Sequence, residues 1–462
     1  MRIDTALTPR DLLSDTERVF TLAARKVRAL DRAWDPARGA PVFTVEGKYT
    51  TRGWTEWTQG FQYGCAILVF DGTDDRAFFD LGRRRTIKHM LPHVTHTGVH
   101  DHGFNTLSTY GNLRRLVKEK RVPYDGWEEL FYDTAIQCSG AVQAARWAPT
   151  ADGPGTLDGG GYVYSFNGPH SLFVDTLRTI RVLGSAHQLG HVLLRENDQR
   201  VSLLGRLIQH GLTTAKYIVF QGTTDHAYDV RGRTAHEAVF NRNDGNFRSR
   251  ATQQGYSPFS TWTRGLAWAM LGFAEELEFL RTLDARQIRS ACGVRKAEVL
   301  GAFERAGRAT CDHYIKDCSA RDGIVYWDDG APGLSMLGDW RAQPADPTND
   351  HEPVDSSASA IAAQGLLRLG RALGAARGKQ YLQAGLTVAS ALFNEPYLST
   401  NRQHEGLLLH SVYHRPNGWD HVPPGRKIPC GESSLWGDYH LLELANLIKR
   451  RGERGPYPTF FT

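Results

Sequence analysis

Apolar residues recur at helical spacing along most of the chain, and segments rich in glycine, aspartate, asparagine and proline interrupt this periodicity. Alternation of apolar and polar residues, which is typical of strands, is rare. The pattern predicts about twelve helices, and Thr8 with Pro9 is expected to cap the first of them. The expected ranges are 8–30, 59–70, 74–91, 103–120, 127–147, 170–191, 197–218, 263–282, 295–316, 355–374, 378–393 and 431–450.

Short turns join successive helices. At 70–79 and at 369–382, glycine marks the end of one periodic run and a polar residue precedes the next. No linker rich in proline or serine divides the chain, so we expect an all-α fold in which 1–462 forms one toroid of helical pairs. Residues 1–50 would be an N-terminal helix and lead-in, and the length also accommodates an extra helical pair. Long glycine-rich loops such as 149–171 are expected at one rim, where loops of that length usually carry function.

The composition is that of an ordinary globular protein. Apolar residues make up 41% and charged residues 23% of the chain, which excludes disorder, collagen and coiled coil. The formal net charge of +5 is too small to indicate a nucleic-acid partner. Such a charge is compatible with a local basic pocket for an acidic substrate.

The sequence also bears on the compartment. The N-terminal residues lack the basic and then apolar pattern of a signal peptide, and no apolar run approaches the ~20 residues of a membrane span. The six cysteines are scattered, without a C-x-x-C pair or zinc-type spacing, as expected for free thiols in a reducing compartment. We therefore expect a cytoplasmic protein without a membrane partner, whose oligomeric state stays open.

A dense group of titratable residues at 96–105 precedes an apolar helix. Asp101 can either cap that helix or act as a carboxylate at a rim. Metal ligation must be weighed because the region contains His93, His96, His100 and His102. Pro92 and Gly98 disfavour the helix on which the 96/100 spacing would form a ligand pair, so we expect no metal.

Asp175 falls inside an apolar run with helical spacing, where a carboxylate is costly unless it is paired or lines a cavity. One interpretation is a structural ion pair with Arg178, three residues later on the same helix face. In the other interpretation Asp175 lines a pocket, and desolvation raises its pKa and suits it to proton donation.

Further polar islands lie at 253–268, 407–414 and 430–439. Trp262 and Trp268 are six residues apart, so on one helix they would face different directions. Arg264 can bind a carboxylate ligand or pair with a structural acid. Together the islands place aromatic rings, two acids, an arginine and hydroxyls around the ring, which favours a carbohydrate enzyme.

These islands, in this order, resemble glycoside hydrolase family 88, the unsaturated glucuronyl hydrolases, and more loosely the unsaturated rhamnogalacturonyl hydrolases. The matching blocks, within roughly 50–450, are Trp57-Thr-Gln-Gly60-Phe61, His100-Asp101-x-Gly103-Phe104, Asp175, Gln254-Gly255-Tyr256, Trp262-x-Arg264-Gly265-x-Ala267-Trp268, Asp355-Ser356-Ser357-Ala358, Leu409-His410-x-Val-Tyr413 and Ser434-Leu435-Trp436-Gly437-Asp438-Tyr439. The resemblance implies an (α/α)6 barrel.

The resemblance also implies a chemistry without metal or cofactor. Such enzymes hydrate the C4=C5 double bond of a terminal unsaturated uronic acid on an oligosaccharide, and Asp175 would protonate C4 and then help water add at C5. Asp101 would hold sugar hydroxyls and tune the charge of Asp175. The implied substrate-binding residues are Trp57, His100, Gln253, Gln254, Trp262, Arg264, Trp268, His410, Ser433 and Ser434.

Three positions depart from the family pattern. Gln253 stands where the family usually has histidine, Leu266 where it has glutamine, and Gln62 where an aromatic residue follows the G-F pair. These departures are expected near the ligand, so the substrate stays open within the oligosaccharides and polysaccharides that contain uronic acid.

The main rival is a polysaccharide lyase on the same type of toroid, cleaving a polyuronate such as glucuronan or alginate by β-elimination. That reaction needs a group that neutralises the carboxylate and a Tyr or His that moves the C5 proton. Candidates are Asn167, His170, His210, Arg250 and Tyr256. The pattern also fits an ordinary glycosidase, an epimerase-like enzyme or a non-catalytic sugar-binding toroid. We favour the hydrolase because both family acids, Asp101 and Asp175, are present.

Overall fold

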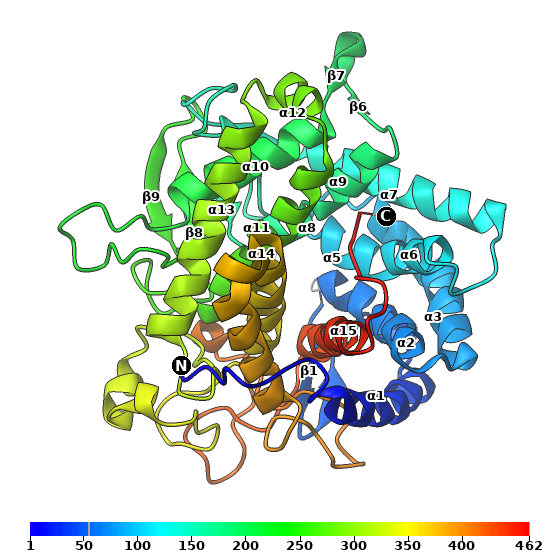
Figure 1. Cartoon of the computed structure of the whole chain (residues 1–462), viewed down its shortest axis with the longest axis vertical. Coiled ribbons are helices and arrows are strands. Elements are labelled where there is room, and N and C mark those ends of the chain that lie inside the picture. Colours follow the sequence, from blue (N-terminus) through cyan, green and yellow to red (C-terminus); the bar gives the residue numbers. More distant parts are fainter. Residues whose placement is uncertain (54–55, 462) are drawn as a thin grey trace.

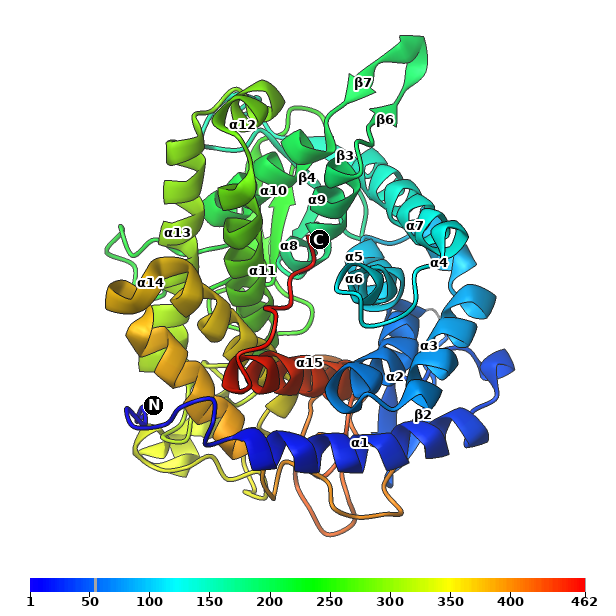
Figure 2. The ribbon, with the colours of Figure 1, turned by 45° about the vertical axis from the view of Figure 1, so that its right-hand side comes forward.

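Two concentric rings of helices make up the protein in the computed structural model, which describes residues 1–53 and 56–461 (Figure 1). The inner ring closes because each inner helix packs on the next and the last packs on the first (Figure 2). In ring order its members are α2 (Gln59–Thr73), α5 (His102–Thr106) with α6 (Asn112–Lys118), α8 (Thr176–Thr179) with α9 (Arg181–Gln188), α11 (Thr263–Thr282), the first part of α14 (Ser356–Leu392) and α15 (Leu435–Gly452).

The outer ring returns the chain between inner helices. It comprises α1 (Leu13–Ala33), α3 (Arg76–His89), α7 (Gly126–Ala145), α10 (Leu203–Tyr217), α13 (Lys296–His313) and the second part of α14. The two parts of α14 are separate because Gly374, with φ 79° and ψ 173°, lies outside the helical region, as the predicted break between 374 and 378 requires. The all-α prediction of an (α/α)6 toroid is confirmed. Within the described ranges, no helix is both long and apolar enough to cross a membrane.

Several predicted elements differ from the structure. The helix expected at 197–218 begins only at Leu203, and a π-helical turn, Leu107–Gly111, interrupts the range 103–120. The range 170–191 divides into strand β5 (Ser171–Phe173), α8 and α9, because a short apolar run fits a buried strand as well as a helix. The first helix begins at Leu13, and the Thr8 hydroxyl donates to Asp11 Oδ2 at 2.7 Å in the preceding turn, so Thr8 is not its cap. The short helices α4 (Leu91–Val94) and α12 (Ala285–Cys292) were not predicted.

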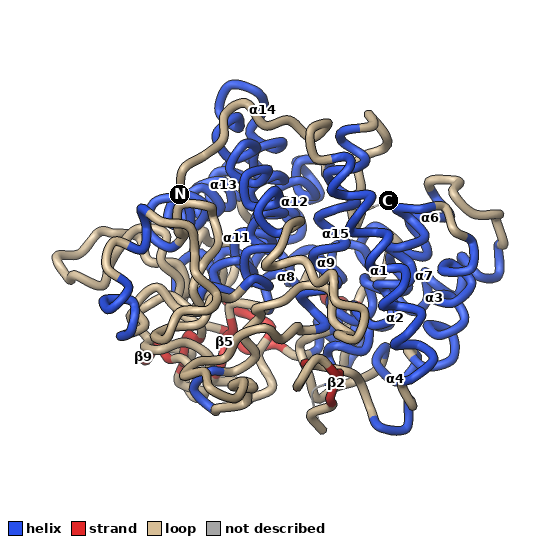
Figure 3. Tube along the Cα trace, turned by 90° about the horizontal axis from the view of Figure 1, so that it is seen from below, coloured by secondary structure: helices blue, strands red, loops and turns tan. Residues whose placement is uncertain are grey.

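Short antiparallel strands accompany the helices, and Figure 3 shows β2, β5 and β9 among the loops on one side of them. The pairs are β1 (Phe43–Val45) with β2 (Lys48–Thr50), β3 (Trp147–Pro149) with β4 (Gly161–Val163), β6 (Leu193–Leu194) with β7 (Arg200–Val201), and the three-stranded sheet β5, β8 (Glu237–Phe240), β9 (Phe247–Ala251). In that sheet Ala238 lies opposite both Leu172 and Arg250. Strand β8 is therefore held beside the segment that leads into Asp175.

All inner helices begin at this loop-rich end, because each is preceded by an outer helix that carries the chain back to it. The residues that immediately precede them are Thr58, Asp101, Asp175, Trp262, Asp355 and Ser434. Positions far apart in the sequence are thereby gathered at one end of the toroid.

The opposite end of the inner ring contains buried ion pairs. Arg178, whose side chain is fully buried, lies 2.9 Å from Glu275 and 3.1 Å from Glu443. The C-terminal segment crosses this end (Figure 2), where Pro458 O accepts from Arg368 at 3.1 Å. Since removing one partner of a buried pair costs about 3–5 kcal/mol, these pairs hold the helices in register.

Closure of the inner ring joins segments from the two ends of the sequence. Helix α15 packs on α2, and Asn446 Nδ2 donates to Leu68 O at 3.0 Å. Arg450 on α15 also pairs with the buried Asp71 on α2. The ring is therefore complete only when the last inner helix is in place.

Gly103→Ala tests the contact between α5 and α8. A Cβ at Gly103 would lie 1.9 Å from Thr179 O, and we expect the forced separation to lower the free energy of unfolding by about 1–3 kcal/mol. In the matched control Gly301→Ala on α13, the new Cβ would meet only Arg305 Nη1, at 3.2 Å, and a gain of about 0.5–1 kcal/mol is expected. Thermal unfolding followed by circular dichroism measures both, and an unchanged midpoint for Gly103→Ala would contradict this packing.

Candidate functional site

A pocket lies at the loop-rich end, where the inner helices begin. The residues from the predicted site that line it are Trp57, His100, Asp101, Asp175, Gln253, Gln254, Trp262, Arg264 and Trp268. The lining residues that were not predicted as site residues are Phe104, Phe166, Tyr413, His414, Asn417 and Trp419. The pocket therefore combines two carboxylates, one arginine and many aromatic rings.

Two aspartates and a histidine form a buried cluster in this pocket. His100 Nε2 lies 3.2 Å from Asp175 Oδ1 and 3.7 Å from Asp101 Oδ1. The acids meet because Asp101 directly precedes α5 and Asp175 directly precedes α8, which are neighbours in the inner ring. Asp101 makes no capping hydrogen bond through its side chain, so the capping interpretation is wrong.

Burial and mutual charge act together on the pKa values of this cluster. Burial raises the pKa of Asp101, the charge of Asp175 raises it further, and His100 only partly opposes them. Burial lowers the pKa of His100, but the charge of Asp101 and the hydrogen bond with Asp175 outweigh burial and raise it above its ordinary value. The His100 imidazole therefore holds a proton between two carboxylates.

The expected rise in the pKa of Asp175 is not what the structure shows. Burial does act in that direction, but the hydrogen bond from His100 and the charge of His100 outweigh it, so the pKa is lowered. The structural ion pair with Arg178 is also wrong, because Arg178 turns to Glu275 and Glu443 at the other end of the ring. Asp175 is thus a carboxylate whose nearest proton lies on His100.

Three of the four histidines weighed as metal ligands, His93, His100 and His102, have other side-chain partners. His93 Nδ1 lies 3.3 Å from Asn105 Nδ2, and His102 Nδ1 lies 2.7 Å from Ser139 Oγ. The other ring nitrogen of His102 lies 2.9 Å from the backbone oxygen of His96. Within the described ranges these imidazoles do not converge on one point.

Arg264 is fixed in the pocket wall by several acceptors. Its guanidinium lies 2.9 Å from the buried Asp355 and donates to Tyr413 O at 2.7 Å and to Gln254 Oε1 at 3.0 Å. The pairing with a structural acid, one of the two interpretations of Arg264, is confirmed. Because Asp355 is an N-cap residue of α14, this pair also ties α11 to α14.

Aromatic rings form most of the remaining wall. Trp57 stacks on Trp436 with ring centroids 5.1 Å apart, and Trp268 lies 4.8 Å from the Phe104 ring. Trp262 precedes α11 with extended backbone (φ −61°, ψ 111°), so it does not share a helix with Trp268, and both rings line the pocket. Large rigid faces of this kind suit contact with sugar rings.

One loop contributes lining residues that were not predicted as site residues, although His414 ends the polar island at 407–414. His414, Asn417 and Trp419 lie between the end of α14 and the start of α15, where no periodicity indicates which side chains face inwards. Phe104 and Tyr413, by contrast, stand inside the matched blocks and could have been assigned from their neighbours.

Of the three departures from the family pattern, one lines the pocket. Gln253 is part of the wall, and its backbone nitrogen donates to His236 Nδ1 at 3.0 Å. Leu266 is fully buried inside α11, and Gln62 lines a separate cavity with Lys26. The expectation that all three departures lie near the ligand is therefore wrong for two of them.

Three predicted substrate-binding residues do not line the pocket. His410 Nδ1 accepts from Gly431 N at 3.0 Å, and Ser433 Oγ donates to Leu408 O at 2.6 Å. Ser434 caps α15 by accepting from Gly437 N at 3.1 Å. These side chains support the loops and helix start behind the wall.

The candidate lyase residues are dispersed, and none of the five is part of the described pocket lining. His210 is buried and accepts from Val163 N at 3.1 Å, and Arg250 donates to Tyr217 O at 3.1 Å. Tyr256 is 53% exposed. The other two candidates are Asn167, which donates to Glu237 at 3.3 Å, and the half-buried His170. The acid–base set that β-elimination needs is not assembled by these residues.

His236 is a buried residue near the acids that the sequence did not single out. Its ring lies 4.5 Å from the Phe173 ring and 5.0 Å from the Trp262 ring. Burial lowers its pKa to about 4, so it is neutral beside Asp175. His236 could not be recognised as a site residue from the sequence, because it directly precedes the short strand β8 and belongs to no motif.

Comparison with known proteins supports the resemblance seen in the sequence, although no family model matches the chain. It is 26% identical over 418 residues to the unsaturated glucuronyl hydrolase of Bacillus sp. (strain GL1), covering 88% of this chain and 90% of that one. It is 24% identical over 464 residues to the unsaturated chondroitin disaccharide hydrolase of Streptococcus pyogenes serotype M1, covering 97% and 95%. The resemblance to unsaturated glucuronyl hydrolases is confirmed.

Solved structures share the fold. The crystal structure of unsaturated glucuronyl hydrolase from Bacillus sp. GL1 superposes with a TM-score of 0.68 at 22% identity, covering 95% of this chain and 97% of that one. An unsaturated glucuronyl hydrolase specific for heparin gives a TM-score of 0.68 at 17% identity, covering 97% and 100%. The toroid is therefore common to this chain and to these enzymes.

The two carboxylates around His100 predict an unusual titration. We expect His100 to keep its proton above the ordinary histidine pKa of about 6.5, and Asp175→Asn to lower its pKa because a neighbouring negative charge is lost. NMR titration of histidine-labelled protein measures both, with Ser433→Ala as a control outside the pocket. A His100 pKa that is the same in wild type and Asp175→Asn would contradict the assigned cluster.

Proposed function

We propose that this protein is an unsaturated uronyl hydrolase, which hydrates the C4=C5 double bond of a terminal unsaturated uronic acid on an oligosaccharide. One observation carries the proposal: Asp101 and Asp175 converge on His100 inside an aromatic pocket at the end where the inner helices begin. The curated relatives are named for activity on unsaturated uronic acids, which supports the same substrate class.

The proposed reaction consumes one water molecule. A proton adds to C4 and water adds to C5, which gives a hemiketal at C5. The ring then opens to a ketone at C5, and the hemiacetal left at C1 collapses and releases the neighbouring sugar as an alcohol. The residues must therefore supply a proton at C4 and accept one from the attacking water.

Asp175 is the proposed acid and base for these two proton transfers. In the free protein its pKa is lowered, and the available proton lies 3.2 Å away on His100. A bound uronate adds negative charge and excludes water, and both effects raise the pKa of a nearby carboxyl group. Substrate binding would thus move the proton from His100 to Asp175, so that Asp175 is protonated only when its substrate is present.

Asp101 and the pocket wall would position the sugar. The raised pKa of Asp101 suits a carboxyl group that shares hydrogen bonds with sugar hydroxyls. Trp57, Trp268 and Trp419 offer faces for sugar rings, and the fixed guanidinium of Arg264 places a positive charge in the wall that attracts a uronate carboxylate. The ring of inner-helix N-termini adds to that attraction.

The proposal extends to the cellular compartment of the enzyme and to the source of its substrate. The six cysteines are free thiols in the structure, which favours a reducing compartment, and we place the protein in the cytoplasm. Residues 1–462 would form one catalytic domain whose substrates are oligosaccharides produced by a polysaccharide lyase. We do not adopt the lyase interpretation, because its candidate acid–base residues do not come together in the pocket.

Asp175→Asn tests the proposed acid. We expect kcat on lyase-generated unsaturated oligosaccharides to fall by about 10²–10⁴-fold because the transferable proton is lost. The assay follows the fall in ultraviolet absorbance as the conjugated double bond disappears. Tyr256→Phe, at an exposed ring outside the pocket, is expected to keep wild-type activity.

The same assay separates the two enzyme classes. A lyase would make the absorbance rise on intact polyuronates and would lose activity in Tyr256→Phe. That pair of results would refute the hydrolase proposal.

A further inference from the structure

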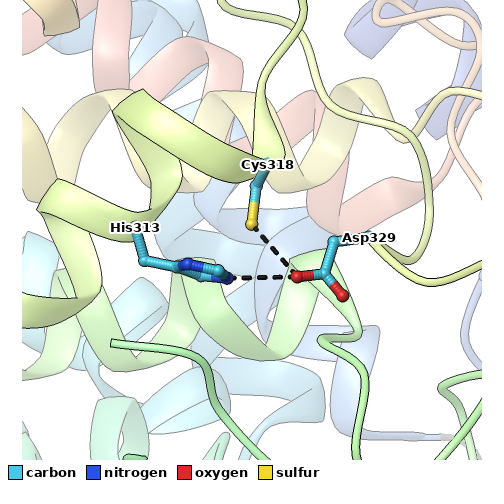
Figure 4. A group of neighbouring side chains, drawn as sticks. All are labelled: His313, Cys318 and Asp329. Carbon is cyan, nitrogen blue, oxygen red and sulfur yellow. Dashed lines mark hydrogen bonds and ion pairs between the residues drawn. The ribbon is translucent and has the colours of Figure 1, made fainter. Parts of the chain in front are cut away.

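A second cluster of ligand-type side chains lies outside the pocket, at the end of α13. Figure 4 shows His313, Cys318 and Asp329 pointing toward one another, and their ligand atoms all lie within 4.8 Å of each other. His313 Nε2 is 3.1 Å and Cys318 Sγ is 3.7 Å from the same oxygen, Asp329 Oδ2. All three side chains are buried, with 0% of His313 and 2% of Asp329 exposed.

The backbone brings these side chains together from two segments. A π-helical turn, Tyr314–Cys318, follows α13 and sets residues four or five apart on one face, so Cys318 and Asp317 both approach His313. Asp329 comes from the loop beyond, where its Oδ1 accepts from Thr261 N at 2.7 Å. π-Helical turns of this kind occur frequently at functional sites.

We propose that His313 Nε2, Cys318 Sγ and Asp329 Oδ2 bind one divalent transition-metal ion of the zinc type. Bonds of about 2.0–2.3 Å at tetrahedral angles place neighbouring ligand atoms about 3.3–3.5 Å apart, close to the 3.1 Å and 3.7 Å found here. Imidazole and thiolate ligands favour zinc over magnesium or calcium. Water would complete the fourth position.

A supporting carboxylate is already in place behind the histidine. Asp317 Oδ2 lies 3.2 Å from His313 Nδ1, the ring nitrogen that does not face Asp329. A hydrogen bond from this nitrogen to a carboxylate fixes the tautomer and raises the basicity of a metal-bound histidine. Asp317 remains 47% exposed and offers a route by which an ion could enter.

The negative charges of the cluster can be balanced either by protons, without a metal, or by a bound metal ion. Arg233, 3.4 Å from Asp329, and a protonated His313 offset the carboxylates of Asp317 and Asp329. Both ring nitrogens of His313 face carboxylate oxygens, at 3.2 Å and 3.1 Å, which is the arrangement of a doubly protonated imidazole, and the Cys318 thiol is buried beside it. A divalent ion that displaces one proton from each of His313 and Cys318 leaves the net charge unchanged, so binding should release about two protons.

The site would brace one wall of the pocket. Asp329 accepts a hydrogen bond from Thr261 N, and the adjacent Asp328 accepts one from Tyr256 N at 2.8 Å. Trp262, which lines the pocket, pairs with Asp328 through a β-bridge. An ion at this position would tie the end of α13 to the loop that precedes α11, whatever reaction the pocket performs.

Metal binding can be measured on the full chain without any sugar. Chelator-treated protein is titrated with Co²⁺ and, separately, Zn²⁺, and elemental analysis follows removal of excess ion. We expect about one ion per chain, a thiolate-to-cobalt charge-transfer band, release of about two protons and a higher thermal midpoint. Less than a tenth of an ion per chain, or cobalt bound without the thiolate band, would overturn the proposal.

Two variants and a control locate the ion. Cys318→Ser should remove the charge-transfer band, and Asp317→Asn, at a half-exposed position, should weaken affinity about 10–100-fold. Cys138→Ser, at a half-buried cysteine on α7, should bind as wild type does. Wild-type affinity in Cys318→Ser would overturn the assignment. Because binding is read directly, each of these results is independent of whether the pocket hydrolyses sugars.

Discussion

The common direction of the inner helices is the constraint on which the rest of this protein depends. Since every outer helix returns the chain to the same end, residues that precede inner helices meet there although they are far apart in sequence. Asp101 and Asp175 are brought to His100 in this way, and Arg264 is brought to Asp355. The partial positive charge of helix N-termini lowers the cost of holding carboxylates at this end. Toward the opposite end, the charge of Arg178 neutralises the buried carboxylates of Glu275 and Glu443.

The sequence was sufficient for the architecture because long amphipathic helices have a strong period and clear ends. The break at Gly374 was visible as a glycine between two apolar runs, and its φ of 79° shows why glycine stands there. The prediction of one helix over 170–191 is wrong at its start, because Ser171 to Phe173 form a strand that pairs with β8, a partner no local pattern reveals. Pairing with the distant strand β8, and not the local sequence pattern, determines the structure of Ser171 to Phe173.

The site was predictable only where side chains stand next to helix starts. Asp101, Asp175 and Arg264 occupy such positions, so the order of motifs around the ring was enough to place them. Trp419 and Asn417 come from an irregular loop, and His236 from the edge of a short strand, and neither setting has a period that marks an inward face. The protonation state of Asp175 could not be predicted from the sequence, because its pKa depends on the distance to His100.

The closure of α15 against α2 has a consequence for biosynthesis. Asn446 and Leu68 are 378 residues apart, so their contact waits for almost the whole chain to be made. At about 5–20 residues per second on the ribosome, the open flank of α2 stays uncovered for roughly 20–75 s after it emerges. A partial ring exposes apolar helix faces during that interval, and the nascent chain is then most dependent on chaperones and most prone to aggregation.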